Sequence, residues 1–145
     1  MEETLRTAIV EDEDAAARDL EECLKRYCES RGISCSTERF RDGKTFLEQY
    51  SPRYDLIFMD AAKGQYIHFL PDILKLMPEG GVLLSDNVLQ DGDVCESRFA
   101  VTRRNRTIHA RMRDYLYELK HHEELRTDIL PVGDGMTISV RISRP

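Results

Sequence analysis

Several features are absent from this chain of 145 residues, and each absence narrows the class of protein. The four cysteines lack both the CxxC spacing of a zinc site and the density of a disulfide scaffold, so we expect reduced, mostly buried thiols. No apolar run approaches the roughly 20 residues that span a bilayer, and the acidic start MEETLRT is not typical of a signal peptide. We therefore expect a cytoplasmic protein without a membrane partner.

Basic residues are also fewer than acidic residues. The chain has 27 Asp and Glu residues against 21 Lys and Arg, which gives a formal net charge of -6. This balance provides no general electrostatic reason to bind nucleic acid or an anionic membrane. The GxGxxG fingerprint of dinucleotide-binding proteins does not occur anywhere in the chain. A divalent cation is the expected partner, and the sequence identifies no protein partner.

The length and the composition favour one domain. Hydrophobic residues make up 41% of the chain and charged residues 33%, enough for one ordinary hydrophobic core. No internal repeat, low-complexity segment or linker rich in Gly, Ser or Pro marks a boundary. We therefore expect a single domain over residues 1–145.

Short apolar segments alternate with amphipathic segments along the chain, which is typical of a doubly wound α/β fold. Parallel strands are expected at 7–10, 33–40, 54–60 and 82–85. Helices are expected at 14–31, at 46–50 before Pro52, at 66–77 and at 108–121. Two further strands, 125–130 and 136–142, flank the turn Gly133-Asp134-Gly135. The pattern predicts a three-layer α/β/α sandwich whose mostly parallel sheet ends in a C-terminal antiparallel hairpin.

Acidic residues directly follow three of the expected parallel strands. Glu11 and Asp12 come after the first, Asp60 closes the third, and Asp86 and Asn87 follow the fourth. Because parallel strands end at the same edge of a sheet, we expect these side chains to converge. Oxygen ligands of this kind suit magnesium or another divalent cation. The sequence predicts a metal site here, and the alternative is that the acids only solvate a loop rim.

The first sixty residues resemble the receiver domain of bacterial response regulators. The resemblance rests on two segments, AIVEDE at 8–13 and YDLIFMD at 54–60. It implies that Glu11 and Asp12 bind magnesium and that Asp60 accepts a phosphoryl group. Ser85 would stand in for the receiver hydroxyl. The residues after Asp60 depart from the receiver pattern, and no strand near the C-terminus ends in the expected Lys-Pro.

The later part of the chain resembles cation-dependent O-methyltransferases of the catechol and caffeoyl-CoA type. The matching segments are FMDAAKGQY at 58–66, PEGGVLLSDNVL at 78–89 and GDG at 133–135. The resemblance implies that Asp60, Asp86 and Asn87 are metal ligands and that Lys63 is the base near the substrate hydroxyl. Nothing before Tyr54 matches the glycine-rich loop of that family. S-adenosylmethionine is therefore an unlikely cofactor on this interpretation.

The two resemblances overlap at the strand Tyr54–Asp60. We interpret the chain as an engineered chimera, receiver-like over about 1–60 and methyltransferase-like over about 54–145, with natural recombination as the alternative origin. We expect a stably folded hybrid that keeps a residual divalent-cation site without efficient catalysis, and so is not an enzyme. One alternative is a phosphorelay module that uses Asp60 as phosphoacceptor. The other is a magnesium-dependent O-methyltransferase that uses Lys63.

Overall fold

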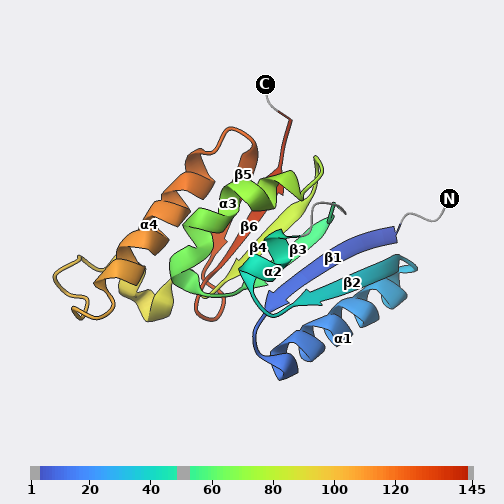
Figure 1. Ribbon diagram of the computed structural model, residues 1–145, viewed down its shortest axis with the longest axis horizontal. Helices are drawn as coiled ribbons and strands as arrows, with labels where there is room; N and C mark the ends of the chain where they lie inside the picture. The colour runs from blue at the N-terminus through green and yellow to red at the C-terminus, as the bar shows by residue number, and fades with distance from the viewer. Residues whose placement is uncertain (1–3, 49–52, 144–145) are drawn as a thin grey trace.

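The computed structural model describes residues 4–48 and 53–143, and within these ranges six strands form one mixed sheet (Figure 1). The strands are β1 (Thr4–Glu11), β2 (Ser34–Phe40), β3 (Leu56–Asp60), β4 (Val82–Asp86), β5 (Leu125–Leu130) and β6 (Met136–Arg141). Their order across the sheet is β2-β1-β3-β4-β6-β5. The first four are parallel, whereas β6 runs antiparallel to both β4 and β5. The predicted parallel sheet and antiparallel hairpin are confirmed.

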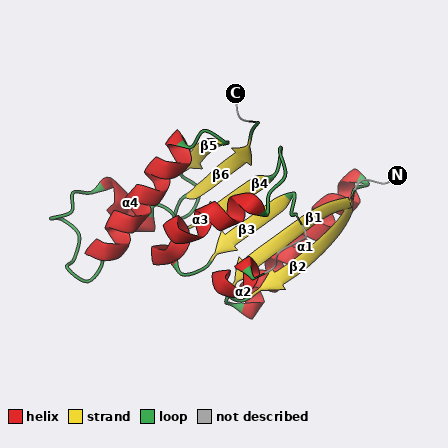
Figure 2. Cartoon of the chain, turned by 45° about the horizontal axis from the view of Figure 1, so that its top comes forward, coloured by secondary structure: helices red, strands yellow, loops and turns green. Residues whose placement is uncertain are grey.

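Helices cover both faces of the sheet (Figure 2). They are α1 (Asp14–Arg31), α2 (Gly43–Leu47), α3 (Tyr66–Lys75) and α4 (Arg106–His121), with the short 3-10 helices η1 (Lys63–Gln65) and η2 (Gln90–Cys95). Helix α1 lies on one face, and α2, α3 and α4 lie on the other. The predicted three-layer α/β/α sandwich is confirmed.

The hydrophobic core is unequal on the two faces. The larger cluster lies under α2, α3 and α4 and includes Ile57, Met59 and Leu83 from the sheet. A smaller cluster under α1 centres on Ile9 and Phe58. The strand that contains Ile57 to Met59 has a neighbour on each side, and polar β2 lies at the sheet edge. Both strand positions follow from hydrophobic content, because a central strand is buried on both faces.

Local signals set several helix ends. Gly32 ends α1 in the left-handed conformation at φ 65°, where its N–H donates to Glu29 O at 3.2 Å. Asp42 caps α2 by accepting a hydrogen bond from Thr45 N at 2.7 Å. Helix α2 ends at Leu47, earlier than predicted, and Tyr50 lies outside the described residues.

The C-terminal hairpin has a polar buried side. Thr137 and Ser139 of β6 are fully buried, while Met136, Ile138 and Val140 are half-buried on the opposite side. The hydroxyl of Thr127 on β5 lies 2.9 Å from Ser139 Oγ and 2.9 Å from a carbonyl oxygen of α4. The alternation therefore gives the strand, but the apolar residues do not face α4.

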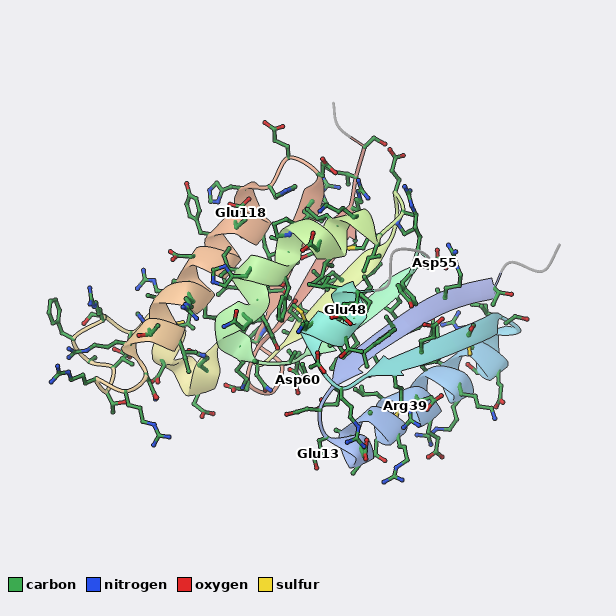
Figure 3. All side chains as sticks on the ribbon, viewed as in Figure 1. Glu13, Arg39, Glu48, Asp55, Asp60 and Glu118 are labelled. Carbon is green, nitrogen blue, oxygen red and sulfur yellow. The ribbon has the colours of Figure 1, made fainter. Side chains whose placement is uncertain are left out.

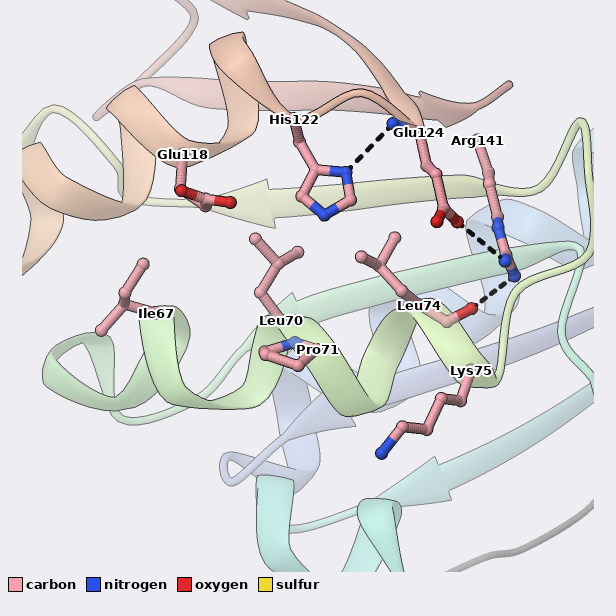
Figure 4. Close-up of a pocket in the computed structure, with 9 residues that line it drawn as sticks. All are labelled: Ile67, Leu70, Pro71, Leu74, Lys75, Glu118, His122, Glu124 and Arg141. Atoms are coloured by element: carbon pink, nitrogen blue, oxygen red, sulfur yellow. Dashed lines mark hydrogen bonds and ion pairs between the residues drawn. The ribbon is translucent and has the colours of Figure 1, made fainter. Parts of the chain in front are cut away.

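Arg141 fastens the last strand to α3 (Figure 4). Its guanidinium donates to Leu74 O at 2.6 Å and to Met77 O, and it pairs with Glu124 at 3.0 Å. These carbonyls lie at the C-terminal end of α3 and just beyond it, where a half-buried arginine supplies them with a hydrogen-bond donor. An open cavity of about 480 Å³ lies beside this anchor, between α3 and the end of α4.

The cysteines are less buried than the sequence suggested. Cys28 is buried, Cys35 is half-buried, and Cys23 and Cys95 are exposed; none is in a disulfide. The prediction of mostly buried thiols is wrong, because Cys23 lies on the outer face of α1 and Cys95 closes the exposed turn η2. In the described ranges, no helix combines the length and the apolar content needed to cross a bilayer.

Candidate active site

An open cavity of about 590 Å³ lies beyond the carboxyl ends of β1, β3 and β4. It is lined by Asp12, Asp60, Ala61, Ala62, Lys63, Gly64, Gln65, Asn87 and Ile108. Four of the residues predicted from the sequence are therefore present in one cavity, namely Asp12, Asp60, Lys63 and Asn87. Side chains around these strand ends are visible in Figure 3, where Asp60 is labelled.

The carboxyl groups of Glu11 and Asp60 lie close together at the ends of β1 and β3, next to this cavity. The two residues are direct neighbours in the register of β1 and β3, and Glu11 is only 6% exposed. Burial first, and the charge of Asp60 next, raise the pKa of Glu11 from its ordinary 4.5 to about 7, against the hydrogen bond from Glu13 N, which lowers it. The pair therefore favours either a bound proton or a nearby cation.

Asn87 connects the ends of β3 and β4. Its Nδ2 donates to Asp60 Oδ1 at 3.2 Å, and its backbone has a left-handed φ of 56°. Asp86 turns back on the chain, because its Oδ1 accepts a hydrogen bond from Asn87 N at 2.8 Å. Asp86 and Glu11 do not line the cavity, so only part of the predicted five-residue set faces it.

The donor set fits a weakly held hard cation rather than a protein-enclosed metal centre. Among the described residues, no three His, Cys, Asp or Glu side chains form a group that could hold a metal ion. The cavity instead offers the carboxylates of Asp12 and Asp60 together with the amide of Asn87. Magnesium commonly keeps several waters and needs only one or two carboxylates. The predicted cation site is compatible with this set and stays a prediction.

Lys63 lies between two cavities. It begins η1, is half-buried, and lines both the main cavity and a second one of about 170 Å³. Asp91, Asp93 and Asp134 contribute acidic groups to the second cavity. Lys63 thus borders the space that a molecule bound in either cavity would occupy.

Tyr66 contacts the backbone at the ends of β3 and β4, a role that no sequence pattern indicated. It is fully buried, and its hydroxyl lies 3.3 Å from Met59 O and 3.4 Å from Asp86 O. Burial, with a smaller effect of Asp60, raises the pKa of Tyr66, so the phenol stays a neutral donor. In the sequence, Tyr66 ends the segment FMDAAKGQY and begins an expected helix, and neither position indicates these contacts.

Ser85 lies away from the cavity. It is fully buried in β4, and its Oγ lies 2.6 Å from Tyr115 Oη on α4. The hydroxyl is therefore used in a contact between sheet and helix. Ser85 does not line the cavity that contains Asp60 and Lys63.

The turn at 133–135 holds the loop that follows Asn87. Val88 N donates to Gly135 O at 3.1 Å, and Leu89 N donates to Asp134 O at 3.0 Å. The Asp134 carboxylate also accepts a hydrogen bond from Asp91 N. The sequence predicted this turn but not its contact, since nothing local indicates which distant loop a turn will meet.

These features agree with a family match. A model of the O-methyltransferase family matches residues 12–142, so the chain belongs to that family. Caffeoyl-CoA O-methyltransferase 2 of Populus trichocarpa is 34% identical over 122 residues, which cover 80% of this chain and 45% of the relative. The chain spans less than half the length of the curated relatives it matches.

Solved methyltransferase structures share the fold. The Podospora anserina methyltransferase PaMTH1, solved with SAH bound, superimposes with a TM-score of 0.62 at 18% identity, covering 97% of this chain and 72% of the other. The structure of TomG, an O-methyltransferase of Streptomyces achromogenes in complex with SAM, gives a TM-score of 0.61 at 18% identity. That match covers 97% of this chain and 62% of TomG.

The family match corrects the chimera interpretation. It runs through both supposed halves without a break at Tyr54–Asp60, so the receiver assignment, the phosphorelay module and the designed origin are wrong. The phosphoacceptor role of Asp60 and the hydroxyl role of Ser85 rested only on the receiver assignment, so they lose their support. The resemblance had a physical cause, because any doubly wound sheet places polar residues after buried strands. Short segments of that kind fit more than one family.

The expectations about activity and cofactor are also wrong. A hybrid without catalysis does not agree with membership of an enzyme family that matches residues 12–142. The missing glycine-rich loop made S-adenosylmethionine an unlikely cofactor in the sequence-based interpretation, yet proteins of this fold are solved with SAM or SAH. A short loop motif was therefore too narrow a criterion for the donor.

Proposed function

We propose that this chain carries the catalytic residues of a cation-dependent O-methyltransferase, which transfers a methyl group from S-adenosylmethionine to an acceptor hydroxyl. One observation carries the proposal: Lys63 lines the same cavity as Asp60 and Asn87, which share a 3.2 Å hydrogen bond. A base and a set of oxygen ligands that face one cavity are what the activation of a hydroxyl requires.

The residues divide the chemistry between them. Lys63 accepts the proton of the acceptor hydroxyl, whose oxygen then attacks the methyl carbon as the carbon–sulfur bond breaks. S-adenosylmethionine would supply the methyl group, and its sulfur would keep the electron pair of that bond. A divalent cation near Asp60 and Asn87 would lower the pKa of the acceptor hydroxyl. Tyr66 keeps the ends of β3 and β4 at a fixed separation through its contacts with two backbone carbonyls.

The acceptor class follows from local charge and from the relatives. Residues 97–106 contain four arginines and no acidic residue, in a chain of net charge -6. Asn105 of this basic segment lines the second cavity, beside Lys63. A phosphate-bearing acceptor suits such a surface. The named relatives are caffeoyl-CoA O-methyltransferases, and we propose a coenzyme A thioester of a hydroxylated aromatic acid as the acceptor.

The test compares the wild-type chain with Lys63→Met and Lys75→Met. Calorimetry measures the binding of S-adenosylmethionine in millimolar magnesium, and transfer of labelled methyl to caffeoyl-CoA measures turnover. Lys63→Met is expected to lower kcat by about 10² to 10⁴-fold with donor affinity unchanged. Lys75 is exposed, forms an ion pair with Asp72 at 2.6 Å and does not line the cavity that contains Lys63. Its variant is therefore expected to retain turnover. A wild-type chain that binds no donor would overturn the proposal.

A further inference from the structure

The turn that carries Lys63 is too short to hold itself in place. Helix η1 spans only Lys63–Gln65, and its internal hydrogen bonds are Gln65 N to Ala62 O at 2.8 Å and Tyr66 N to Lys63 O. A single 3-10 turn has poor hydrogen-bond geometry and little stability of its own. The position of Lys63 therefore depends on contacts from other elements.

Helix α4 supplies such a contact from the outer side. Arg111 Nη1 donates to Gly64 O at 3.1 Å, next to Lys63 in the chain. A Cβ built on Gly64 would lie 3.9 Å from Arg111 Cδ and 4.0 Å from Ile108 Cγ1, so the side chains of one helix face pack against the turn. Tyr66 holds the other end of the turn through its buried hydroxyl.

The anchoring of α4 does not depend on this bond. Met112, Tyr115, Leu116 and Leu119 bury the adjacent face of the helix in the larger core cluster. Arg111 is half-buried and lies on the cavity side, one turn after Ile108. The loss of its guanidinium should therefore leave the helix in place and release η1 alone.

We propose that Arg111 is a positioning residue that holds Lys63 in the geometry needed for proton transfer. The inference rests on the proposed function, because it assumes that Lys63 is the base. A charged donor makes a stronger hydrogen bond to a backbone carbonyl than a neutral donor does. A displacement of about 1 Å at a reacting group can cost about 100-fold in rate, so a contact that fixes this turn can have a large effect on kcat. Lysine at position 111 carries a donor but lacks the planar fork.

The test uses Arg111→Met and Arg111→Lys, with Arg113→Met as the matched control. Arg113 lies on the same helix but reaches Glu96 O at 3.5 Å rather than η1. Arg111→Met is expected to lower kcat for caffeoyl-CoA by about 10 to 100-fold, with the melting temperature and the affinity for S-adenosylmethionine unchanged. Arg111→Lys should recover part of the loss, and Arg113→Met should match the wild type.

A second readout does not depend on turnover. Lysine amines are labelled by reductive ¹³C-methylation, and the Lys63 signal is assigned from its absence in Lys63→Arg. In Arg111→Met, this signal is expected to move toward the position of the exposed lysines, while Arg113→Met leaves it unchanged. If the wild type binds no donor and turns over no acceptor, the proposed function fails. The Lys63 signal still tests whether Arg111 holds Lys63 in place. An unmoved Lys63 signal in Arg111→Met, or an unchanged kcat, would overturn the positioning role.

Discussion

Gly135 packs against Leu89 so closely that a Cβ atom built on Gly135 would stand 2.2 Å from Leu89 Cγ. Gly135 also has a left-handed φ of 82°, and its carbonyl accepts the hydrogen bond from Val88 N. The C-terminal hairpin therefore meets the loop after Asn87 only because position 135 has no side chain. This contact links a distant turn to the backbone of the candidate active site.

Gly135→Ala tests this packing. The added methyl group must displace Leu89, and the left-handed backbone is unfavourable for alanine as well. We expect the free energy of unfolding, measured by urea denaturation, to fall by about 2–4 kcal/mol. Gly80→Ala is the matched control, since Gly80 has φ 79° with nothing within 4 Å of its added Cβ. It should cost only about 1 kcal/mol, and equal losses at both positions would refute the packing argument.

The crowded carboxyl group of Glu11 predicts a pH dependence of stability. Its pKa is about 7 in the folded chain and 4.5 ordinarily, so the folded state holds the proton more tightly. This contribution is fully present below pH 4.5 and is lost as the pH rises through 7. In buffer with a metal chelator, we expect it to remove up to about 3 kcal/mol from the free energy of unfolding.

Glu11→Gln should abolish that part of the pH dependence. The variant is expected to gain stability over the wild type at pH 8 and to gain little at pH 4, as measured by urea denaturation at both values. Glu13→Gln is the control, because that side chain is exposed and only the backbone N–H of Glu13 contacts Glu11. A Glu11→Gln chain with the wild-type slope between pH 4 and 8 contradicts the prediction.

Magnesium should stabilise the folded chain. A ligand that binds only the folded state raises the melting temperature, so a titration to millimolar magnesium is expected to raise it by a few degrees. Asp60→Asn removes a carboxylate from the cavity and should abolish the shift. Asp72→Asn, which changes an acid paired with Lys75 on α3, should retain it. The cation proposal fails if the wild-type midpoint does not move.

Thr137 offers a stabilising substitution. Its Oγ1 is buried without a hydrogen-bond partner among the described residues, which costs desolvation free energy. Thr137→Val keeps the shape and removes the hydroxyl, so we expect the free energy of unfolding to rise by about 1 kcal/mol. Ser139→Ala deletes a hydroxyl that lies 2.9 Å from Thr127 Oγ1 and should lower it by a similar amount. Opposite signs in thermal melts of the two variants are the expected result.

Much of the fold could be predicted because its signals are local. The strand Leu56–Asp60 is central and apolar up to its final aspartate, the polar strand Ser34–Phe40 lies at the edge, and Gly32 ends α1. The site was predicted in part, since the carboxyl ends of parallel strands meet and bring Asp60 to Asn87. The family was misjudged in the first half, where a strand followed by acids fits several doubly wound folds.

The sequence by itself determined the order of strands and helices, the acids at the strand ends and the segment that carries Lys63. Those features follow from hydrophobic period and from residues next to one another in the chain. Only the tertiary structure decided that Asp86 turns to its own neighbour, that Ser85 is buried against Tyr115, and that Gly135 admits Leu89. Side-chain direction depends on packing against residues distant in the chain, and no local pattern contains that information.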